Sequence, residues 1–519
     1  MGEGATMGGH VFVVRGDVRQ IRCDARLVSV YETHEPKPEW FHEEEQALRT
    51  IRADESWRAR TTRVRQLGSA GSGPTLWVAK VGLGHHTTLN DAMESVSQFL
   101  DRASAALDRS KLVSDRCKPL LALHVVATGL RNSGAQKGDA IVRLLALVDE
   151  CAAKHDVDVV IVAHEEEAYA AVQVTRSTRR NGVSPELDPP LHDLARELAQ
   201  KARHGDLSAL VGAGLSMNAG LPSWWKLLAT AATAFEVGPC DEGEDALAYA
   251  SRIERKAGPD RFRQAILEQC QPTRYALGHA LLASTPIREF VTLNYDQLLE
   301  GAARDAGAPL TVIPHGRVKA KDRWLLKLHG SVDRPKDIVI TAQDYAGFDE
   351  WRAAFKGVIE AQLITRHMLF VGFGMADPNV DKVLTTVARA AQGDDGQKGD
   401  TVGTVLMFSS TIPDKYAQLY PLRFVCVGPA DMTSAERARQ LEILLDEVAR
   451  IAEDGTHHLL DRRFDGLHVT EVAVREKVAD FLTGLHATHP DSRLRREIME
   501  RLRPLMGGDP RLTPLLNPK

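Results

Sequence analysis

The sequence predicts an α/β protein built around a Rossmann-like parallel sheet, preceded by a second α/β domain and followed by a helical tail. A chain of 519 residues is too long for one ordinary hydrophobic core. Short apolar runs alternate with helical periodicity over residues 1–185 and again over 186–430, and such alternation is typical of α/β layers. Helical spacing dominates 431–519. We therefore expect three regions with these boundaries.

The composition limits the class of protein. Hydrophobic residues make up 43% of the chain and charged residues 26%, as in globular proteins. There is no run of about 18 apolar residues, and the first residues lack the basic and apolar segments of a signal peptide. We therefore expect a cytoplasmic protein without a membrane span. The formal net charge of -5 gives no overall electrostatic reason to expect nucleic acid as a partner.

Cysteines and acidic runs bear on metal binding. Six cysteines lie far apart and none belongs to a Cys-x-x-Cys pair, so no zinc ribbon is expected. Two acidic runs, 43–45 and 165–167, stand next to His42 and His164 and offer metal-ligand chemistry. Consecutive carboxylates point in different directions on a helix, however, which favours a solvated face. We therefore expect no metal site.

The first region reads as alternating strands and helices. The expected strands are 10–14, 24–30, 75–79, 120–126 and 157–162, and the expected helices are 89–107 and 138–153. Breakers at 181–185 and Pro189-Pro190 end this region, and apolar residues then recur at helical spacing over 191–202.

The second region is organised around the stretch 208–225. Ser208 to Val211 read as a short buried strand, and Gly212 and Gly214 permit a tight turn before a helix. Strand, glycine turn and helix in this order present backbone N–H groups to a pyrophosphate, with the Ser216 hydroxyl in reach. By itself the pattern fits a bare packing turn equally well.

Further strands of the second region deliver polar groups to one edge of the same sheet. The expected strands are 290–294, 325–328, 368–371, 404–408 and 423–427. The first two end at Asn294 and His329, and the third ends before Gly372 and Gly374. Since parallel sheets bind ligands outside the carboxyl ends of their strands, we expect these residues to share one site.

Four motifs in order over about 206–428 resemble the sirtuin superfamily. They are Gly212-Ala-Gly-Leu-Ser216 with Gly220-Leu-Pro222, Thr292-Leu-Asn-Tyr-Asp296, Lys327-Leu-His-Gly330 and Val371-Gly-Phe-Gly-Met-Ala-Asp377. The resemblance implies that the long helical stretch 224–282 is a lid over the nicotinamide end of a cleft. Trp224 at its start then either contacts the ligand or anchors the lid in a core.

The resemblance also assigns roles to residues. Asn294 and His329 would be catalytic, with Asn294 holding water or ribose hydroxyls and His329 acting as general base. Asp296 would bind the carboxamide of nicotinamide. The dinucleotide would contact Gly212, Ala213, Gly214, Ser216, Gly220, Pro222, Thr292, Asp296, Gly372, Gly374 and Asp377. His124, His315 and His367 have no such context and read as ordinary histidines.

Three functions remain open. The motif variants resemble bacterial sirtuin-like effectors that hydrolyse NAD with water, deplete it during phage infection and stay inactive until triggered. This resemblance implies NAD as substrate, an oligomer of identical chains, and a companion or phage-derived trigger. The second hypothesis is an NAD-dependent protein deacylase or ADP-ribosyl transferase on the same fold. The third is a non-catalytic sensor or assembly protein that binds NAD or ADP-ribose.

The first region resembles a macro domain. Gly16-Asp17-Val18 and Cys23-Asp24-Ala25 match its start, while Thr128-Gly129 and 132–134 match its phosphate loop loosely. The sequence departs from the family at 29–32, where an Asn-rich segment is expected. The resemblance implies a nucleotide ligand, with Asp24 receiving an adenine amino group. The alternative is a scaffold or oligomerisation domain.

The tail contains a basic amphipathic stretch at 493–503. Such a helix fits contact with nucleic acid or a membrane, but docking on a neighbouring subunit is the favoured interpretation. Residues 507–519 are expected to be a frayed end.

Overall fold

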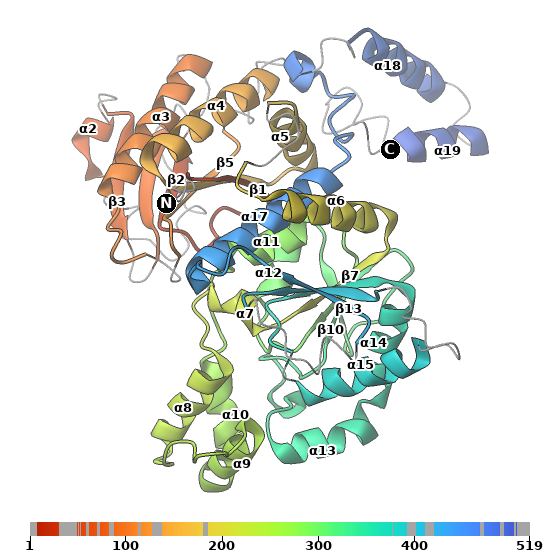
Figure 1. Ribbon diagram of the computed structural model, residues 1–519. Coiled ribbons are helices and arrows are strands. Elements are labelled where there is room, and N and C mark those ends of the chain that lie inside the picture. The colour runs from red at the N-terminus through yellow and green to blue at the C-terminus, as the bar shows by residue number, and fades with distance from the viewer. Residues whose placement is uncertain are drawn as a thin grey trace. The chain divides into compact units, whose positions relative to one another are not determined.

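The computed structural model in Figure 1 divides into two compact units, each with its own sheet. The first unit comprises Met1–Val113, Lys118–Asp188 and Glu453–Lys519, and the second comprises Ser114–Cys117 and Pro189–Ala452. The structure describes residues 8–30, 49, 51, 53–58, 62–69, 73–81, 88–112, 116–126, 137–179, 185–375, 377–391, 401–409, 420–467, 472–487, 492–502 and 505. No helix within these ranges is both long and apolar enough to cross a membrane.

The first unit contains a six-stranded sheet in the order β1-β6-β5-β2-β4-β3. The strands are β1 (Val11–Arg15), β2 (Ala25–Val30), β3 (Val64–Ser69), β4 (Thr75–Lys80), β5 (Leu120–His124) and β6 (Asp158–Ala163). Neighbouring strands run parallel except β3, which pairs antiparallel with β4. The helices are α2 (Glu55–Arg58), α3 (Leu89–Ala106), α4 (Lys137–His155) and α5 (Glu166–Arg179). The predicted α/β class is confirmed, and β3 is an addition to the predicted strands.

Two predicted features of the first unit have structural explanations. The carboxylate of Asp24 accepts a hydrogen bond of 2.7 Å from the backbone N–H of Leu120, so this side chain joins β2 to β5. The run 165–167 forms ion pairs, with Glu165 to Lys137 at 3.0 Å and Glu166 to Arg15 at 2.9 Å. The run at 43–45, the segment 128–134 and the end at 507–519 lie outside the described residues. The macro-domain resemblance stays a prediction.

The second unit contains a seven-stranded parallel sheet in the order β13-β12-β11-β7-β8-β10-β9. The strands are β7 (Leu207–Val211), β8 (Glu289–Thr292), β9 (Leu310–Ile313), β10 (Arg323–Lys327), β11 (His367–Val371), β12 (Gly403–Met407) and β13 (Leu422–Cys426). The chain proceeds from β7 to one side of the sheet and later returns to the other side with β11. This reversal of strand order beside β7 is a topological switch point, where parallel sheets open a crevice.

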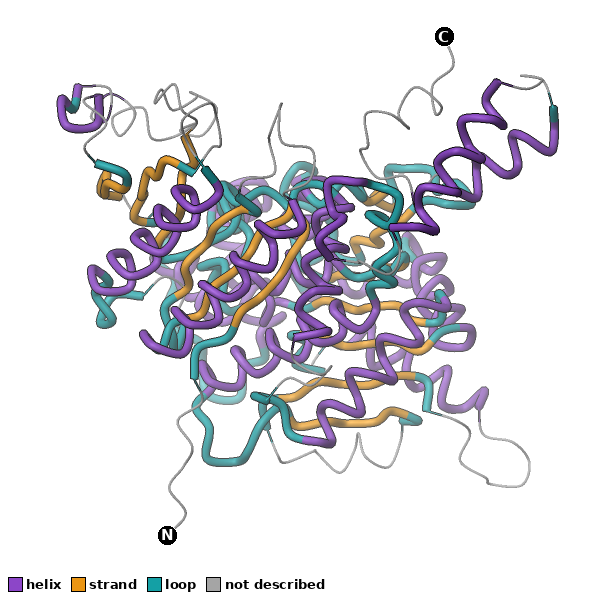
Figure 2. Tube along the Cα trace, turned by 90° about the horizontal axis from the view of Figure 1, so that it is seen from above, coloured by secondary structure: helices purple, strands orange, loops and turns teal. Residues whose placement is uncertain are grey.

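Two groups of helices pack around this sheet. The first group is α6 (Pro189–His204), α11 (Leu277–Ser284), α12 (Leu298–Asp305) and α17 (Ser434–Ala452), and the second is α13 (Ala342–Trp351), α14 (Ala353–Thr365) and α15 (Pro378–Ala391). They lie on opposite sides of the sheet in Figure 1, and Figure 2 shows the orange strands running between purple helices. A sheet covered on both faces explains why its strands are continuous apolar runs.

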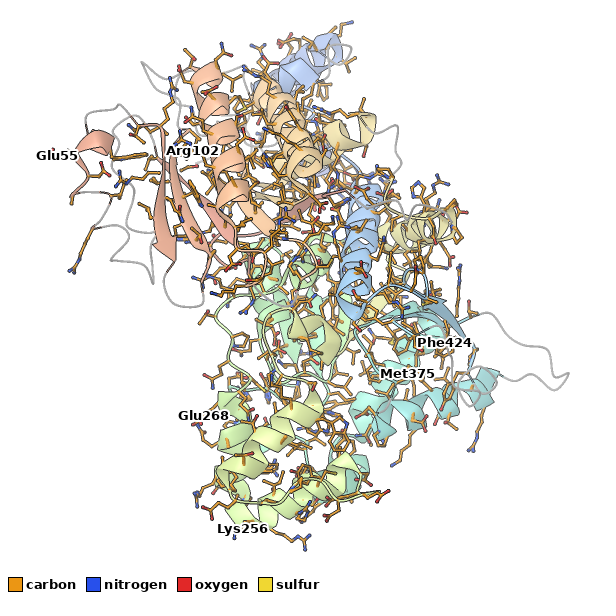
Figure 3. The ribbon with its side chains drawn as sticks, turned by 60° about the vertical axis from the view of Figure 1, so that its left-hand side comes forward. Glu55, Arg102, Lys256, Glu268, Met375 and Phe424 are labelled. Atoms are coloured by element: carbon orange, nitrogen blue, oxygen red, sulfur yellow. The ribbon has the colours of Figure 1, made fainter. Side chains whose placement is uncertain are left out.

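The predicted lid is smaller than the predicted helical stretch. Helices α8 (Trp224–Ala234), α9 (Ala246–Ala257) and α10 (Pro259–Glu268) share a core of their own around Leu228, Ile253 and Phe262. Lys256 and Glu268 mark this lobe in Figure 3. Helix α11 packs instead against α12 and α17. The lid therefore ends near Glu268, and α11, whose residues from Leu277 to Ala283 are all buried, belongs to the layer with α12 and α17.

The predicted tail is divided between the units. Helix α17 belongs to the second unit, where it packs on α6 and where Glu447 contacts His192 at 3.2 Å and Arg450 at 2.5 Å. The chain from Glu453 onward belongs to the first unit, and it includes α18 (Val472–Ala487) and α19 (Arg493–Leu502). The second unit also takes in Arg116, which pairs with Glu442 of α17. Buried polar contacts thus join α17 to His192 of α6 and to Arg116.

Two glycine turns contact each other directly at the ends of β7 and β11. The N–H of Gly212 donates to the carbonyl of Val371, and the N–H of Gly214 donates to that of Gly372, both at 2.9 Å. A Cβ on Gly212 would lie 2.5 Å from the Gly372 oxygen. A Cβ on Gly372, whose φ is +62°, would lie 2.5 Å from the Leu215 nitrogen. These glycines therefore allow backbone to pack on backbone.

We predict that Gly372→Ala destabilises the second unit by roughly 2–5 kcal/mol, because the added methyl group overpacks the junction and the residue keeps an unfavourable positive φ. Gly374→Ala is the matched control, since a Cβ there meets nothing within 4 Å. Chemical denaturation of both variants measures the difference. Equal stabilities would contradict this account of the junction.

Candidate functional site

A cavity of about 660 Å³ lies where β7, β8, β10 and β11 of the second unit end. Its walls are the loops that follow these strands and the start of the lid. They include Gly212, Ala213, Gly214, Ser216, Leu221, Pro222, Trp224, Trp225, Leu247, Asn294, Tyr295, Asp296, His329, Tyr345, Gly372, Phe373, Gly374 and Asp377. Residues separated by more than 160 positions in the sequence thus share one cavity.

Most of the predicted site residues line this cavity, but Gly220 and Thr292 do not. Thr292 is buried, and its hydroxyl donates to the carbonyl of Val211 at 2.8 Å and accepts from the N–H of Asn294 at 3.1 Å. Gly220 forms the turn after α7 (Ala213–Met217) with a φ of +89°. These two residues lie behind the lining and shape its loops, and their contact with a dinucleotide stays a prediction.

The amide of Asn294 has a defined orientation. One of its terminal atoms lies 3.1 Å from the carbonyl oxygen of Gly212 and 3.0 Å from the Ser216 hydroxyl. A backbone carbonyl only accepts hydrogen bonds, so the atom facing Gly212 is the Nδ2 donor. The side chain therefore offers its Oδ1 to a ligand as an acceptor. The turn after β7 orients the residue that follows β8.

The Ser216 hydroxyl connects three further side chains. It donates to Oδ2 of Asp296 at 2.9 Å, accepts from Asn294, and lies 3.3 Å from Nε2 of His279. A hydroxyl has one donor and two acceptor positions, so these three partners saturate it when Nε2 of His279 carries hydrogen. The second carboxylate oxygen of Asp296 accepts from the N–H of Leu298 at 3.1 Å. Asp296 is thereby held as a buried anion.

Sequence reasoning missed His279. It lies on the buried helix α11, and burial lowers its pKa to about 4 despite the opposing charge of Asp296. The residue stands in an apolar run with no motif around it, so only the fold reveals its contact with Ser216. Lys327 opens the third motif, but its contacts come from the fold, because its ammonium group donates to the carbonyl of Asp296 and to Glu300 at 2.9 Å. Lys327 thereby fixes the backbone of the loop 294–296.

His329 is buried beside Asp377 and Tyr345. Its Nε2 lies 3.5 Å from Oδ2 of Asp377, and the edge of its ring packs on Tyr345 with centroids 5.3 Å apart. Burial lowers the pKa of His329, the Asp377 charge opposes this, and the Arg352 guanidinium adds to the lowering. The imidazole is therefore neutral near pH 7, which is the state that a general base requires.

Asp377 has more contacts than the glycine-turn motif suggests. Its Oδ1 accepts the N–H groups of Asn379 at 2.9 Å and Val380 at 3.1 Å, which makes it the N-cap of α15. Its Oδ2 accepts the Tyr345 hydroxyl at 2.7 Å. The predicted contact of Asp377 with a dinucleotide stays a prediction, beside this role as helix cap and partner of His329.

Tyr345 is a further residue that sequence reasoning missed. It lies on α13, where the preceding Asp344 accepts from the N–H of Thr341 at 2.9 Å and pairs with Arg263 at 2.9 Å. Arg263 belongs to α10 of the lid and also donates to the carbonyl of Ile338 at 2.8 Å. The lid is thus bonded to the helix that carries Tyr345. No spacing in the sequence signals this contact.

The charge of the cavity is negative. Its lining includes the carboxylates of Asp245, Asp296 and Asp377, but no lysine or arginine among the described residues. Carboxylates favour a cationic group such as a pyridinium ring or a ribose that becomes positive as its bond to nitrogen breaks. Trp224 also lines the cavity and packs on Tyr295 with centroids 6.4 Å apart, so it contacts both the lid core and the cavity.

A possible metal-binding group lies elsewhere, in the first unit. Ligand atoms of Glu453, Asp454 and His457 are within 4.8 Å of one another. The two carboxylates accept backbone N–H groups of their own loop, from Gly455 at 3.1 Å and from Thr456 at 3.1 Å. These hydrogen bonds stabilise a turn, which explains why the three side chains lie close together. The cluster is not part of the cavity of the second unit.

Comparison with known proteins supports the sirtuin resemblance of the second unit. Residues 288–417 match the family described as SIR2-like domain, a range that contains three of the four motifs. The NAD(+) hydrolase ThsA of Enterococcus faecium is 31% identical over 204 residues, which cover 37% of this chain and 42% of the relative. ThsA of Bacillus cereus (strain MSX-D12) is 29% identical over 217 residues, covering 40% and 45%. Defense-associated sirtuin 2 of Bacillus subtilis is 25% identical over 215 residues, covering 39% and 21%.

This chain therefore spans less than half the length of these relatives. The sirtuin-like fold predicted for the second unit is confirmed, together with its Rossmann-like parallel sheet. The matched range begins after the first glycine motif, so the assignment of Gly212 to Pro222 depends on the geometry described above.

We predict that the second unit loses stability in acid because of His279. Its pKa of about 4 in the folded state lies below the ordinary histidine value of 6.5, so the unfolded state binds the proton more tightly. The stability is fully present above pH 6.5 and declines as the pH falls toward 4, by about 3 kcal/mol over that interval. Denaturation curves from pH 7.5 to 4.5 measure this dependence.

His279→Gln should flatten that dependence, because the variant has no imidazole to titrate. His315→Gln is the control, since His315 is an exposed histidine of the same unit. If all three proteins lose stability in acid with the same slope, His279 is not the group responsible.

Proposed function

We propose that this protein hydrolyses NAD to nicotinamide and ADP-ribose in the cavity of the second unit. One observation carries the proposal: the Asn294 amide and the His329 imidazole reach the same cavity from two strand ends, beside a pair of interlocked glycine turns. The names of the relatives, NAD(+) hydrolase in two cases, agree with this chemistry. Mere binding of a nucleotide would not require a buried neutral histidine.

The reaction breaks the bond between C1′ of the ribose and the nicotinamide nitrogen. The electron pair leaves with nicotinamide, and positive charge develops on the sugar. Asp296 and Asp377 stabilise this charge, while Oδ1 of Asn294 accepts a hydrogen bond from a ribose hydroxyl or from the attacking water. Water adds to C1′ and its proton passes to His329. The products are nicotinamide, ADP-ribose and one proton, so atoms and charge balance.

Water rather than an acylated peptide is the proposed nucleophile. A deacylase must lay an acyl-lysine peptide between sheet and lid, and the sequence lacks the paired cysteines of the zinc ribbon that helps build that groove. Here the lid consists of α8, α9 and α10 around their own apolar core, bonded to α13 through Arg263 and Asp344. The proposal therefore favours a closed pocket for one dinucleotide over a channel for a protein substrate.

The biological setting is part of the proposal. A protein that destroys NAD must be silent until needed, and one relative is named a defence-associated sirtuin. We infer an anti-phage effector that acts in the cytoplasm as an oligomer and responds to a companion protein or a phage-derived trigger. The first unit is a suitable receiver of a nucleotide signal through its macro-like features.

The test uses purified full-length protein with NAD as the only organic substrate. We predict that Asn294→Ala and His329→Ala each lower nicotinamide release at least about 100-fold, because each removes a group that acts in the transition state. His315→Ala, a histidine outside the cavity lining, should keep wild-type activity. Nicotinamide and ADP-ribose are measured by liquid chromatography, and circular dichroism checks the fold.

The same variants are compared in cells during phage challenge, where the natural trigger is present. Wild-type cells should lose NAD and cells with either variant should retain it. Nicotinamide release that requires an acyl-lysine peptide would replace this proposal with a deacylase. Equal NAD levels in all three strains would overturn it in favour of a binding protein.

A further inference from the structure

The carboxylate of Asp377 faces two side chains with the same oxygen. Oδ2 accepts the Tyr345 hydroxyl at 2.7 Å and lies 3.5 Å from Nε2 of His329. The first distance is a strong hydrogen bond to an anion, and the second is too long for a well-formed one. Tyr345 therefore holds the atom of Asp377 that would otherwise move closer to His329.

The position of Asp377 is fixed from its other side as well. Oδ1 caps α15 through the N–H groups of Asn379 and Val380, and Pro378 occupies the first helical position. Helix cap and tyrosine together hold both carboxylate oxygens. The carboxylate then faces Nε2 of His329 without closing on it.

We propose that Tyr345 is a positioning residue for His329: by holding Oδ2 of Asp377, its hydroxyl keeps the carboxylate from closing on Nε2 and so prevents a tight imidazolium–carboxylate pair. The inference rests on the proposed function, since it concerns the general base of that reaction. It adds a residue outside the four sequence motifs.

The tautomer follows from the charges around the ring. Asp377 only accepts hydrogen bonds while it is an anion, so the nitrogen that faces it carries the hydrogen and Nδ1 is the basic nitrogen. The other charged or titratable groups near His329 are Tyr345 and Arg352, with Tyr295 and Asp296 in the same cavity lining. Burial of His329 favours the neutral ring, and a tighter contact with Asp377 would favour the charged one.

Two conservative substitutions should therefore act in opposite directions. Tyr345→Phe removes only the hydroxyl and releases Oδ2 toward His329, so the pKa of His329 rises and the acid limb of the pH–rate profile moves to higher pH. Asp377→Asn removes the charge but keeps a residue suited to the helix cap, so the acid limb moves to lower pH. General structural damage would not move the acid limb to higher pH in one variant and to lower pH in the other.

The experiment measures nicotinamide release by the full chain from pH 5 to 9. We expect Tyr345→Phe to move the acid limb up by roughly half a unit to one unit, which lowers the rate about three- to tenfold on that limb and little above it. Tyr420→Phe is the matched control, because the Tyr420 hydroxyl also donates to an aspartate of α15, Asp381, at 2.5 Å, but outside the cavity lining. Its profile should coincide with that of the wild type.

A second measurement does not depend on turnover. Histidine-selective ¹⁵N labelling reports the tautomer and the pKa of His329, whose signals are identified by their loss in His329→Gln. We expect hydrogen on Nε2 in the wild type and a higher pKa in Tyr345→Phe. If both NMR results are obtained but the wild-type protein hydrolyses no NAD, the proposed function is wrong and the role of Tyr345 still stands.

The inference about Tyr345 is overturned by either of two results. One is a Tyr345→Phe profile that falls equally at every pH, with the acid limb in its wild-type place. The other is a His329 pKa that is the same in wild type, Tyr345→Phe and Tyr420→Phe.

Discussion

The contact between the glycine turns after β7 and β11 is the constraint on which the second unit depends. Paired N–H to carbonyl bonds join Gly212 to Val371 and Gly214 to Gly372, at a separation that leaves no room for a side chain. The contact closes one end of the cavity and also fixes the Gly212 carbonyl. Because that carbonyl accepts the Asn294 amide, backbone packing sets the direction of a proposed catalytic side chain.

The polar residues of the cavity form two groups with separate tasks. Ser216 gathers Asn294, Asp296 and His279 on one side, while Asp377 gathers Tyr345 and the region of His329 on the other. Each group holds one carboxylate in a buried place by several hydrogen bonds, which is necessary because an unpaired buried charge is costly. The resulting negative charge suits a reaction in which the sugar becomes cationic.

The lid is joined to the segment around α13 by apolar packing on Ile338 and Ile340 and by polar contacts. Arg263 of α10 pairs with Asp344 of α13, and the adjacent Tyr345 contacts both Asp377 and His329. A movement of the lid would therefore change the surroundings of His329 through Asp344 and Tyr345.

The sequence alone predicted the α/β class, the parallel sheet and about half of the residues that line the cavity. It succeeded because strand ends and glycine turns are local features, and parallel strands bring their carboxyl ends to one edge. It also assigned Thr292 and Gly220 to the ligand, and this stays a prediction, because neither lies in the cavity lining and both shape the loops behind it. Only the tertiary structure revealed the roles of His279, Lys327 and Tyr345, because each acts through a contact with residues that are distant in the sequence. The division of the tail was likewise decided by packing, since helical spacing predicts that a helix buries one face but does not say against which sheet.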